Sequence, residues 1–249
     1  MTPTLTLSHL EYGHKKALFT PLSLHCQPGE VWAVLGANGR GKSTLLDTIT
    51  GVLPALAGEM VVTGGVGIVP QSFRPAFAWR VKEVVLMGRA RHIGLFAQPQ
   101  AEDERQVWDA LALLNITSLA ETLFSTLSGG QQQLVMIARA LVSASQNILL
   151  DEPCSALDLG NQETVLQLIS NLAHAQSRTV MFTTHDPTHA LQVASHTLLL
   201  LPEGQWLAGT TAKVVQEANL QRAYGVAVRK IQLADYPTAV VTPLFNLRR

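Results

Sequence analysis

The chain has 249 residues, enough for one large domain or two small ones. Basic and acidic residues balance at 18 each, so bulk charge gives no support to a surface that binds nucleic acid or an anionic membrane. Two cysteines without CxxC spacing argue against a disulfide framework and favour a reducing compartment. No stretch approaches the ~20 apolar residues of a membrane-spanning helix. We therefore expect a chain that does not cross a bilayer by itself but could dock on one that does.

The first third of the sequence is typical of β-strands. "TLTLSHL" near the N-terminus alternates, and "VWAVL" is an apolar run that leads into a glycine-rich loop. "EMVVTGGVGIVP" predicts two short strands around a Gly-Gly turn. Helical segments follow. Residues 101–115 carry acids in the first turn and place Val107, Leu111 and Leu114 on one face, and residues 129–141 predict a second, apolar helix.

Strands and helices alternate in the second half of the chain. Strands are predicted at 147–151, 179–185 and 196–201, with helices over 162–175 and near Ala190. This alternation indicates a parallel sheet that is covered by helices on both faces. After Pro202 the pattern predicts a strand and two short helices, followed by late strands at 226–233 and 236–245 that the sequence does not place.

The glycine-rich loop matches the phosphate-loop pattern G-x-x-x-x-G-K-[ST] from Gly36 to Ser43. Glycine lets the backbone wrap closely, so that its N–H groups point at phosphate oxygens, and the following helix presents its positive end to the same anion. In this pattern Lys42 reaches the outer phosphates and Ser43 can ligate Mg²⁺. A glycine turn with a chance lysine is the alternative. The preceding apolar strand and the following helical segment favour an ATP-binding loop made of Gly36, Ala37, Asn38, Gly39, Arg40, Gly41, Lys42, Ser43 and Thr44.

A second candidate anion site lies in "LSGGQ" at 127–131. Ser128 is a natural N-cap for the apolar helix, and Gly129 and Gly130 leave backbone N–H groups open to an anion. One domain that binds one nucleotide needs only one such helix start. Two copies arranged head to tail could each lend the second site to the partner's nucleotide, whereas an ordinary capped helix is the simpler alternative.

With these motifs the chain resembles the ATP-binding subunit of an ABC transporter over roughly residues 1–215. Four further motifs follow the family's order. "VPQ" resembles the Q-loop, "ILLDEP" the Walker B segment, "SALD" the D-loop and "FTTHD" the segment of the switch histidine. The resemblance implies an α/β P-loop NTPase cassette with an antiparallel β subdomain, a mostly parallel RecA-like core sheet and a helical signature subdomain at about 75–143. Residues 216–249 are expected to form a C-terminal extension packed on the same domain.

Two adjacent carboxylates follow the predicted strand of the Walker B segment. Asp151 is expected to hold hydrated Mg²⁺, as a Walker B aspartate does, and Glu152 to polarise the attacking water as general base. A solvated loop is the alternative for an Asp-Glu pair, and the four apolar residues before it argue against that alternative.

The remaining roles come from the resemblance. It makes His185 a γ-phosphate contact, Gln71 a contact to Mg²⁺ that starts a mobile segment, and Tyr12 an aromatic that stacks on adenine. A partly buried strand-end tyrosine is the alternative for Tyr12. The residues expected to act on the partner's ATP are Ser128, Gly129, Gly130, Gln131 and Asp158. The expected Mg²⁺ contacts, partly through water, are Ser43, Gln71 and Asp151.

Two positions depart from the family pattern beside these motifs. Cys154 stands where a threonine is common, and Gln132 follows the signature where arginine is frequent. Neither removes a catalytic group, so we predict an active ATPase. The position of Cys154 predicts that thiol reagents reduce this activity.

"WRVKEVVLMGRARHIGLF" and "SALDLGNQ" resemble segments of importer ATPases for iron-siderophore, haem, cobalamin and related complexes, and of their molybdate or tungstate relatives. The expected partners are a second copy, multi-spanning permease subunits and, indirectly, a substrate-binding protein, with no nucleic acid, at the cytoplasmic face of the inner membrane. A zinc or manganese importer, an exporter and a soluble non-transport ATPase remain as alternatives. A groove for a permease helix, or else the subdomain's own core, would contain Phe73, Phe77, Trp79, Leu86, Met87 and Phe96.

Overall fold

The computed structural model describes residues 2–73, 75–93, 97–155 and 157–245. Within these residues, a six-stranded sheet runs in the order β5-β6-β7-β3-β8-β9. Its strands are β3 (Val31–Leu35), β5 (Val66–Val69), β6 (Asn147–Leu150), β7 (Thr179–Thr184), β8 (His196–Leu200) and β9 (Trp206–Thr210). All neighbours are parallel except β8 and β9. This arrangement confirms the mostly parallel core sheet that the family resemblance implied, and it agrees with the parallel sheet that the alternation indicated.

Alternate residues of β3 belong to two different cores, one on each face of the large sheet. Val31, Ala33 and Leu35 pack with α5 (Leu159–His174) and α6 (Pro187–Val193) on one face. Trp32 and Val34 pack on the other face, with α1 (Lys42–Ile49). Because successive side chains of a strand point to opposite faces, a strand covered on both sides must be apolar throughout. This explains why "VWAVL" has no polar residue.

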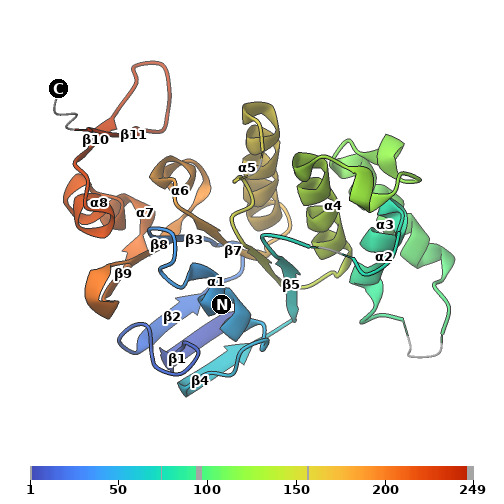
Figure 1. The fold of residues 1–249 in the computed structure, drawn as a ribbon, viewed down its shortest axis with the longest axis horizontal. Helices are drawn as coiled ribbons and strands as arrows, with labels where there is room; N and C mark the ends of the chain where they lie inside the picture. The colour runs from blue at the N-terminus through green and yellow to red at the C-terminus, as the bar shows by residue number, and fades with distance from the viewer. Residues whose placement is uncertain (1, 74, 94–96, 156, 246–249) are drawn as a thin grey trace.

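A three-stranded antiparallel sheet covers the α1 side of the molecule (Figure 1). Its order is β2-β1-β4, from β1 (Leu5–Glu11), β2 (Leu22–Cys26) and β4 (Ala57–Val62). The sequence predicted β4 and β5 as two strands around a Gly-Gly turn, and both strands are present. Gly64 and Gly65 adopt positive φ values of 75°, and the chain crosses here from the small sheet to the edge of the large one.

A group of helices lies at the other side of β5, at the right of Figure 1. It contains α2 (Val81–Leu86), the 3₁₀ turns η1 (Met87–Arg89), η2 (Thr117–Leu119) and η3 (Phe124–Thr126), α3 (Ala101–Leu113) and α4 (Gly129–Val142). Helices α2 and α3 both pack on α4. The predicted helices at 101–115 and 129–141 are therefore confirmed, within one or two residues at their ends.

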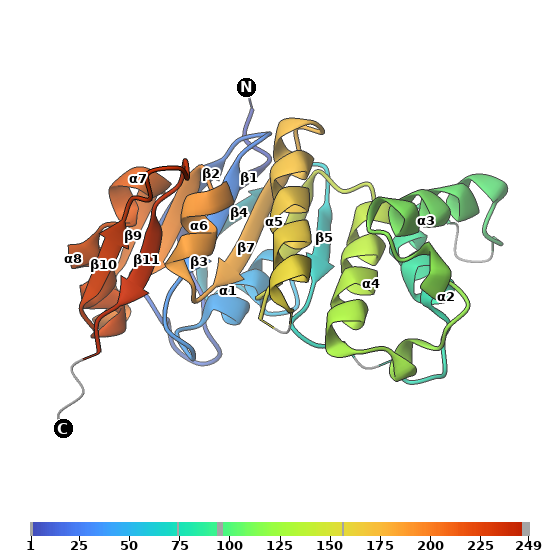
Figure 2. The same ribbon diagram turned by 90° about the horizontal axis from the view of Figure 1, so that it is seen from above.

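The C-terminal segment packs on α6 and on the β9 edge of the large sheet (Figure 2). It comprises η4 (Pro202–Gly204), α7 (Thr211–Val214), α8 (Glu217–Tyr224), β10 (Val228–Ile231) and β11 (Val240–Pro243). The two late strands that the sequence left unplaced form an antiparallel hairpin. The amide of Val241 in β11 donates to the Thr188 hydroxyl of α6 at 3.2 Å. Leu220 and Val228 share the core that contains Val31, and the domain boundary at 215 stays a prediction.

In the part of the chain that the structure describes, no helix combines the length and the apolar character needed to cross a membrane.

Candidate functional site

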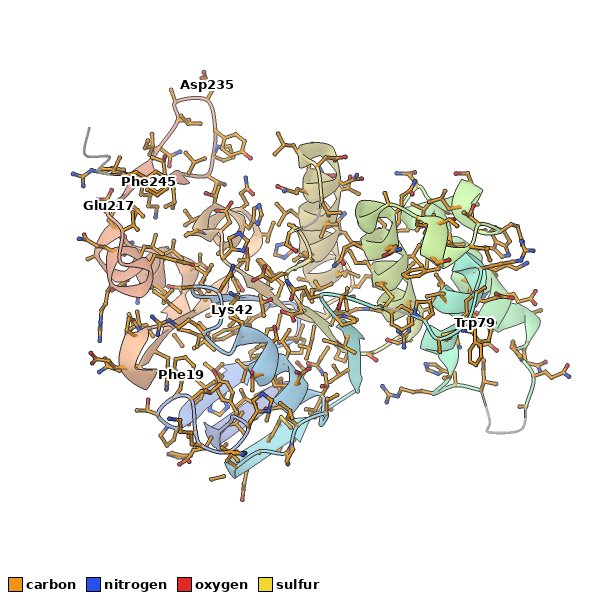
Figure 3. The ribbon with its side chains drawn as sticks, viewed as in Figure 1. Phe19, Lys42, Trp79, Glu217, Asp235 and Phe245 are labelled. Atoms are coloured by element: carbon orange, nitrogen blue, oxygen red, sulfur yellow. The ribbon has the colours of Figure 1, made fainter. Side chains whose placement is uncertain are left out.

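Three neighbouring parallel strands end at the same edge of the large sheet, and each is followed by a predicted site segment. The phosphate loop follows β3, Asp151 and Glu152 follow β6, and His185 follows β7. Carboxyl ends of neighbouring parallel strands form a common edge, which is where ligands bind in open α/β sheets. Lys42, at the start of α1, lies near the centre of the molecule (Figure 3). The fold thus gathers three separated motifs in one place.

The phosphate loop has the backbone that its glycines allow. Gly39 and Gly41 have φ values of 75° and 82°, in the left-handed region that a side chain disfavours. A Cβ atom on Gly41 would also lie 2.6 Å from Cδ1 of Leu18. Gly41 is followed directly by α1, whose N-terminal N–H groups open toward the loop. The loop is therefore built as an anion cradle at a helix start.

Lys42 is held inside this loop rather than extended into solvent. Its side chain is 5% exposed, and Nζ donates to the carbonyl oxygen of Gly36 at 2.9 Å. Nζ also lies 3.2 Å from Oε1 of Glu152. An ion pair with this little exposure is screened weakly by solvent. The lysine of the phosphate loop and the second carboxylate of the Walker B segment therefore share one charge-paired site.

Asp151 and Glu152 differ in their surroundings although they are adjacent. Asp151 is buried and accepts a hydrogen bond of 2.6 Å from the Thr183 hydroxyl. Glu152 has a φ of 47°, which is uncommon outside glycine. Its Oε2 lies 3.3 Å from Nδ1 of His185, whose side chain is half exposed. The structure thus brings Glu152, Lys42 and His185 together, next to the buried Asp151.

A hollow of about 560 Å³ opens over the phosphate loop. Its lining contains both loop residues and residues of other motifs, namely His14, Leu18, Asn38, Gly39, Arg40, Gly41, Lys42, Ser43, Thr44, Gln71 and Glu152. Gln71, which follows β5, therefore faces the same hollow as the loop. His14 and Leu18 belong to no motif in the sequence, so only the structure places them at this hollow.

The donor atoms beside the loop fit a magnesium ion. Ser43 and Gln71 line the hollow. Burial and, after it, the negative charge of Asp151 raise the pKa of Asp47 in α1, so the Asp151 carboxylate lies near the helix that begins with the loop. Hydroxyl, amide and carboxylate oxygens are the ligands that Mg²⁺ accepts, usually with several waters and phosphate oxygens. Among the described residues no group of three His, Cys, Asp or Glu side chains forms a complete metal cage. A site completed by phosphate and water does not need one.

The sequence profile of a protein family described as "ABC transporter" matches residues 19–155, more than half of the chain. The chain belongs to the ABC transporter family. It is an ATP-binding protein of that family, and its fold class is confirmed as the α/β ABC ATPase cassette.

Relatives of this ABC cassette match along almost the whole chain. The molybdate import ATP-binding protein MolC of Haemophilus influenzae is 43% identical over 238 residues, which cover 94% of this chain and 93% of that protein. The hemin import ATP-binding protein HmuV of Burkholderia pseudomallei is 35% identical, with 96% and 99% covered. A solved metal-chelate type ABC transporter in an inward-facing conformation is 40% identical, with a TM-score of 0.92 and 98% and 99% covered.

The "LSGGQ" segment at residues 127–131, which is the family's signature motif, caps helix α4. Oγ of Ser128 accepts from the amide of Gln131 at 3.3 Å, and Oε1 of Gln131 accepts from the amide of Ser128 at 3.0 Å. This reciprocal capping box satisfies two donors at the start of α4 and leaves Gly129 exposed. None of residues 128–131 is among the described residues that line the hollow over the phosphate loop. Asp158 is likewise exposed and caps α5 through the amide of Asn161 at 2.8 Å.

Tyr12 does not lie where a base could stack on it. The side chain is 1% exposed, and its ring stacks on Phe19 with centroids 5.8 Å apart. Burial also raises the pKa of the phenol, whose buried oxygen has no hydrogen-bond partner among the described residues. The structure therefore matches the alternative of a buried tyrosine at a strand end, and it corrects the expected adenine contact. His14 and Leu18 line the hollow in its place.

The "LMGRARH" segment at residues 86–92 is part of the stretch that resembles importer ATPases. It packs on the C-terminal end of helix α4. A Cβ atom on Gly88 would lie 2.0 Å from the Arg139 carbonyl oxygen, so only glycine allows η1 to approach α4 this closely. Arg89 donates to Asp103 at 2.8 Å and to the Val142 carbonyl at 3.1 Å. His92 lies 2.9 Å from the Ser143 carbonyl oxygen. Cationic and polar side chains at the C-terminus of a helix satisfy its unpaired carbonyls.

Three of the six residues expected in the permease groove pack against the hydrophobic core. Phe73 packs edge-on against Phe124 at 5.6 Å and lies under the Arg139 guanidinium at 5.0 Å. Trp79 and Leu86 also pack against the core, Met87 is half-buried, and Phe96 lies outside the described residues. Phe77 differs, since it is 73% exposed. The alternative of a subdomain core therefore holds for Phe73, Trp79 and Leu86.

Cys154 is buried, and burial raises the pKa of its thiol to about 12. Reaction with thiol reagents needs the thiolate and access to it. The raised pKa disfavours the thiolate at neutral pH, and little of the side chain is exposed, so the expected thiol sensitivity is not supported.

Proposed function

We propose that this chain hydrolyses ATP to drive an importer of molybdate or a closely related oxyanion. The observation that carries the proposal is the near-complete match to the molybdate import protein of Haemophilus influenzae. A hemin or other metal-chelate importer is the second candidate, favoured by the hemin import relatives and by the metal-chelate type transporter structure. Specificity for the cargo belongs to other subunits, so the chain's own residues do not distinguish the two.

Binding and hydrolysis divide among the gathered motifs. The amides of residues 36–44 and the ammonium of Lys42 hold the phosphates. Glu152 accepts a proton from the water that attacks the γ-phosphate, and His185 contacts the γ-phosphate beside it. The ion pair between Lys42 and Glu152 supports this assignment, because it places the proposed base next to the lysine that binds the transferred phosphate.

Magnesium completes the proposed site through Ser43, Gln71 and Asp151. When bound, the ion neutralises charge on the β- and γ-phosphates. The side chains of these three residues would direct their oxygen atoms toward the ion. Ser43 does this from the first turn of α1, Gln71 from the end of β5, and Asp151 from the end of β6.

The proposed active unit is a head-to-tail dimer. Ser128, Gly129, Gly130 and Gln131 of one copy would contact the ATP of the other copy, and Asp158 would orient the partner's loop. The separation of residues 128–131 from the hollow within one chain supports this arrangement. The dimer would dock on multi-spanning permease subunits at the cytoplasmic face of the cell membrane, with a substrate-binding protein on the opposite side and no role for nucleic acid.

The deciding experiment begins with a detergent pull-down of the tagged chain from its native membranes. Partners are identified by mass spectrometry, and the isolated complex is reconstituted in liposomes. ATP hydrolysis is then measured with the binding protein added empty, with molybdate, or with hemin. Stimulation by molybdate supports the proposal, and stimulation by hemin alone replaces it with the second candidate. Recovery of soluble partners only would remove the transport function.

A further inference from the structure

We propose that Thr183 is a positioning residue for ATP hydrolysis, which sets the geometry of both Walker B carboxylates through one hydroxyl group. Thr183 is completely buried in β7, with an exposed fraction of 0%. Its Oγ1 donates to Oδ1 of Asp151 at 2.6 Å and accepts from the amide of Glu152 at 2.8 Å. Thr183 lies within the "FTTHD" segment, in which the resemblance assigns a role to His185 alone. The proposal rests on the ATPase activity of the family and not on the identity of the cargo.

A threonine can make both bonds at once because a hydroxyl is a donor and an acceptor. The register of the sheet brings the groups together. Leu150 of β6 lies opposite Phe182 of β7, so the next residues, Asp151 and Thr183, meet at the end of the ladder. The β-branched side chain has few rotamers in a strand, which fixes the hydroxyl with little freedom.

The bond to Asp151 orients its carboxylate. An O–H donor to an ionised carboxylate forms a short, strong hydrogen bond, and the 2.6 Å separation has this length. The bond uses Oδ1 and leaves Oδ2 free of this contact, so it restrains the direction of the group. A metal-binding carboxylate held by such an outer partner depends on it for its direction.

The bond to Glu152 supports an uncommon backbone conformation. Glu152 has a φ of 47°, and a residue other than glycine in this region costs free energy unless its surroundings hold it there. The Glu152 amide would be left without this acceptor if the Thr183 hydroxyl were removed. A relaxed backbone would move the Glu152 side chain away from Lys42 and His185.

Strand β7 then connects the carboxylates to the switch histidine. Thr183 is the second-last residue of β7, and His185 directly follows the strand. Nδ1 of His185 lies 3.3 Å from Oε2 of Glu152. Thr183 and His185 therefore hold Glu152 from two points, one at its amide and one at its carboxylate.

The test compares Thr183→Val with Thr183→Ser in the full chain. Valine keeps the shape of threonine and removes both hydrogen bonds, whereas serine keeps the hydroxyl. We expect valine to lower kcat by about 10- to 100-fold, the usual effect of losing an outer partner of a metal-binding group. The Mg²⁺ concentration for half-maximal activity should rise, the KM for ATP should change by less than about threefold, and serine should restore most of the activity.

Thr197→Val is the matched control. Thr197 is equally buried, lies in β8 and forms a hydroxyl bond of 3.0 Å with Thr211. The Thr197→Val variant also loses a buried hydroxyl group, but this hydroxyl does not contact Asp151 or Glu152. If Thr197→Val lowers stability as much as Thr183→Val but leaves kcat and the Mg²⁺ curve unchanged, the positioning role is supported. Wild-type kcat and Mg²⁺ dependence in Thr183→Val, or a serine variant as impaired as the valine variant, would overturn it.

Discussion

Nζ of Lys42 lies 3.2 Å from Oε1 of Glu152, in a pair that solvent reaches only slightly. The lysine that binds the phosphates is thus charge-paired with the carboxylate proposed to activate water. Phosphate oxygens and the Glu152 carboxylate compete for the same ammonium group. The strength of ATP binding and the reactivity of Glu152 are therefore linked through one contact.

Glu152→Gln removes the carboxylate but keeps the size of the side chain. We expect kcat to fall by about 10²- to 10⁴-fold because a general base is lost. ATP should bind more tightly, since Lys42 no longer has a competing anion, and a nucleotide-bound dimer should accumulate. Steady-state hydrolysis and size-exclusion chromatography with ATP measure these effects. Near-normal hydrolysis would contradict the role of Glu152.

Gly88→Ala tests the close approach of η1 to the signature helix. The added Cβ would lie 2.0 Å from the Arg139 carbonyl oxygen, and overpacking of this kind costs about 1–3 kcal/mol of unfolding free energy. Gly160→Ala is the control, because its Cβ would meet its nearest atom at 3.7 Å and alanine favours a helix. Denaturant unfolding should show a loss of stability for the first variant alone. Equal stability of both variants would refute the close contact.

Tyr12 variants separate a core role from a base contact. Tyr12→Phe removes a buried hydroxyl that has no partner among the described residues, so stability should stay the same or rise slightly. Tyr12→Ala should cost about 3–5 kcal/mol, the usual effect of removing a buried aromatic ring. The KM for ATP of the phenylalanine variant does not distinguish the roles, because both rings stack. Tyr12→Leu does, since it retains an apolar side chain. An unchanged KM in this variant fits the core role, and a KM raised tenfold would contradict it.

Thiol reagents should leave the native protein active at neutral pH. Burial raises the pKa of Cys154 to about 12 and also raises the pKa of Cys26. Below these values the thiols are protonated, so their reactivity increases only as the pH rises toward the pKa. Labelling should therefore be slow in the folded protein and rapid for both cysteines after denaturation. Rapid loss of ATPase activity at pH 7 would show that Cys154 is accessible.

The sequence predicted the elements and the motif positions well because both depend on local patterns. Apolar runs marked β3, β6 and β7, and the residues after them carried the phosphate loop, the carboxylates and the histidine. Parallel strands necessarily bring these ends to one edge. That part of the site followed from residue order alone.

The rest depended on packing between distant segments. Tyr12 occupies a position that the resemblance assigned to adenine, but the stacking on Phe19 decides its burial. Thr183 acts through the register of β6 against β7, which no local pattern specifies. Gly64 and Gly65 have the sequence of a hairpin turn, but the strands on either side of them do not pair. β4 joins the three-stranded sheet and β5 joins the six-stranded sheet.

The position of β3 in the large sheet has a consequence for how the protein is made. Both neighbours of the strand, β7 and β8, come from residues 179–200, far later in the chain. Contacts that distant in sequence form slowly, and a chain emerging from the ribosome presents its N-terminal part first. Strand β3, which leads into the phosphate loop, therefore has no pairing partner until most of the protein has been synthesised. Nucleotide binding should appear only at the end of folding, and ATP would then stabilise complete chains and not nascent fragments.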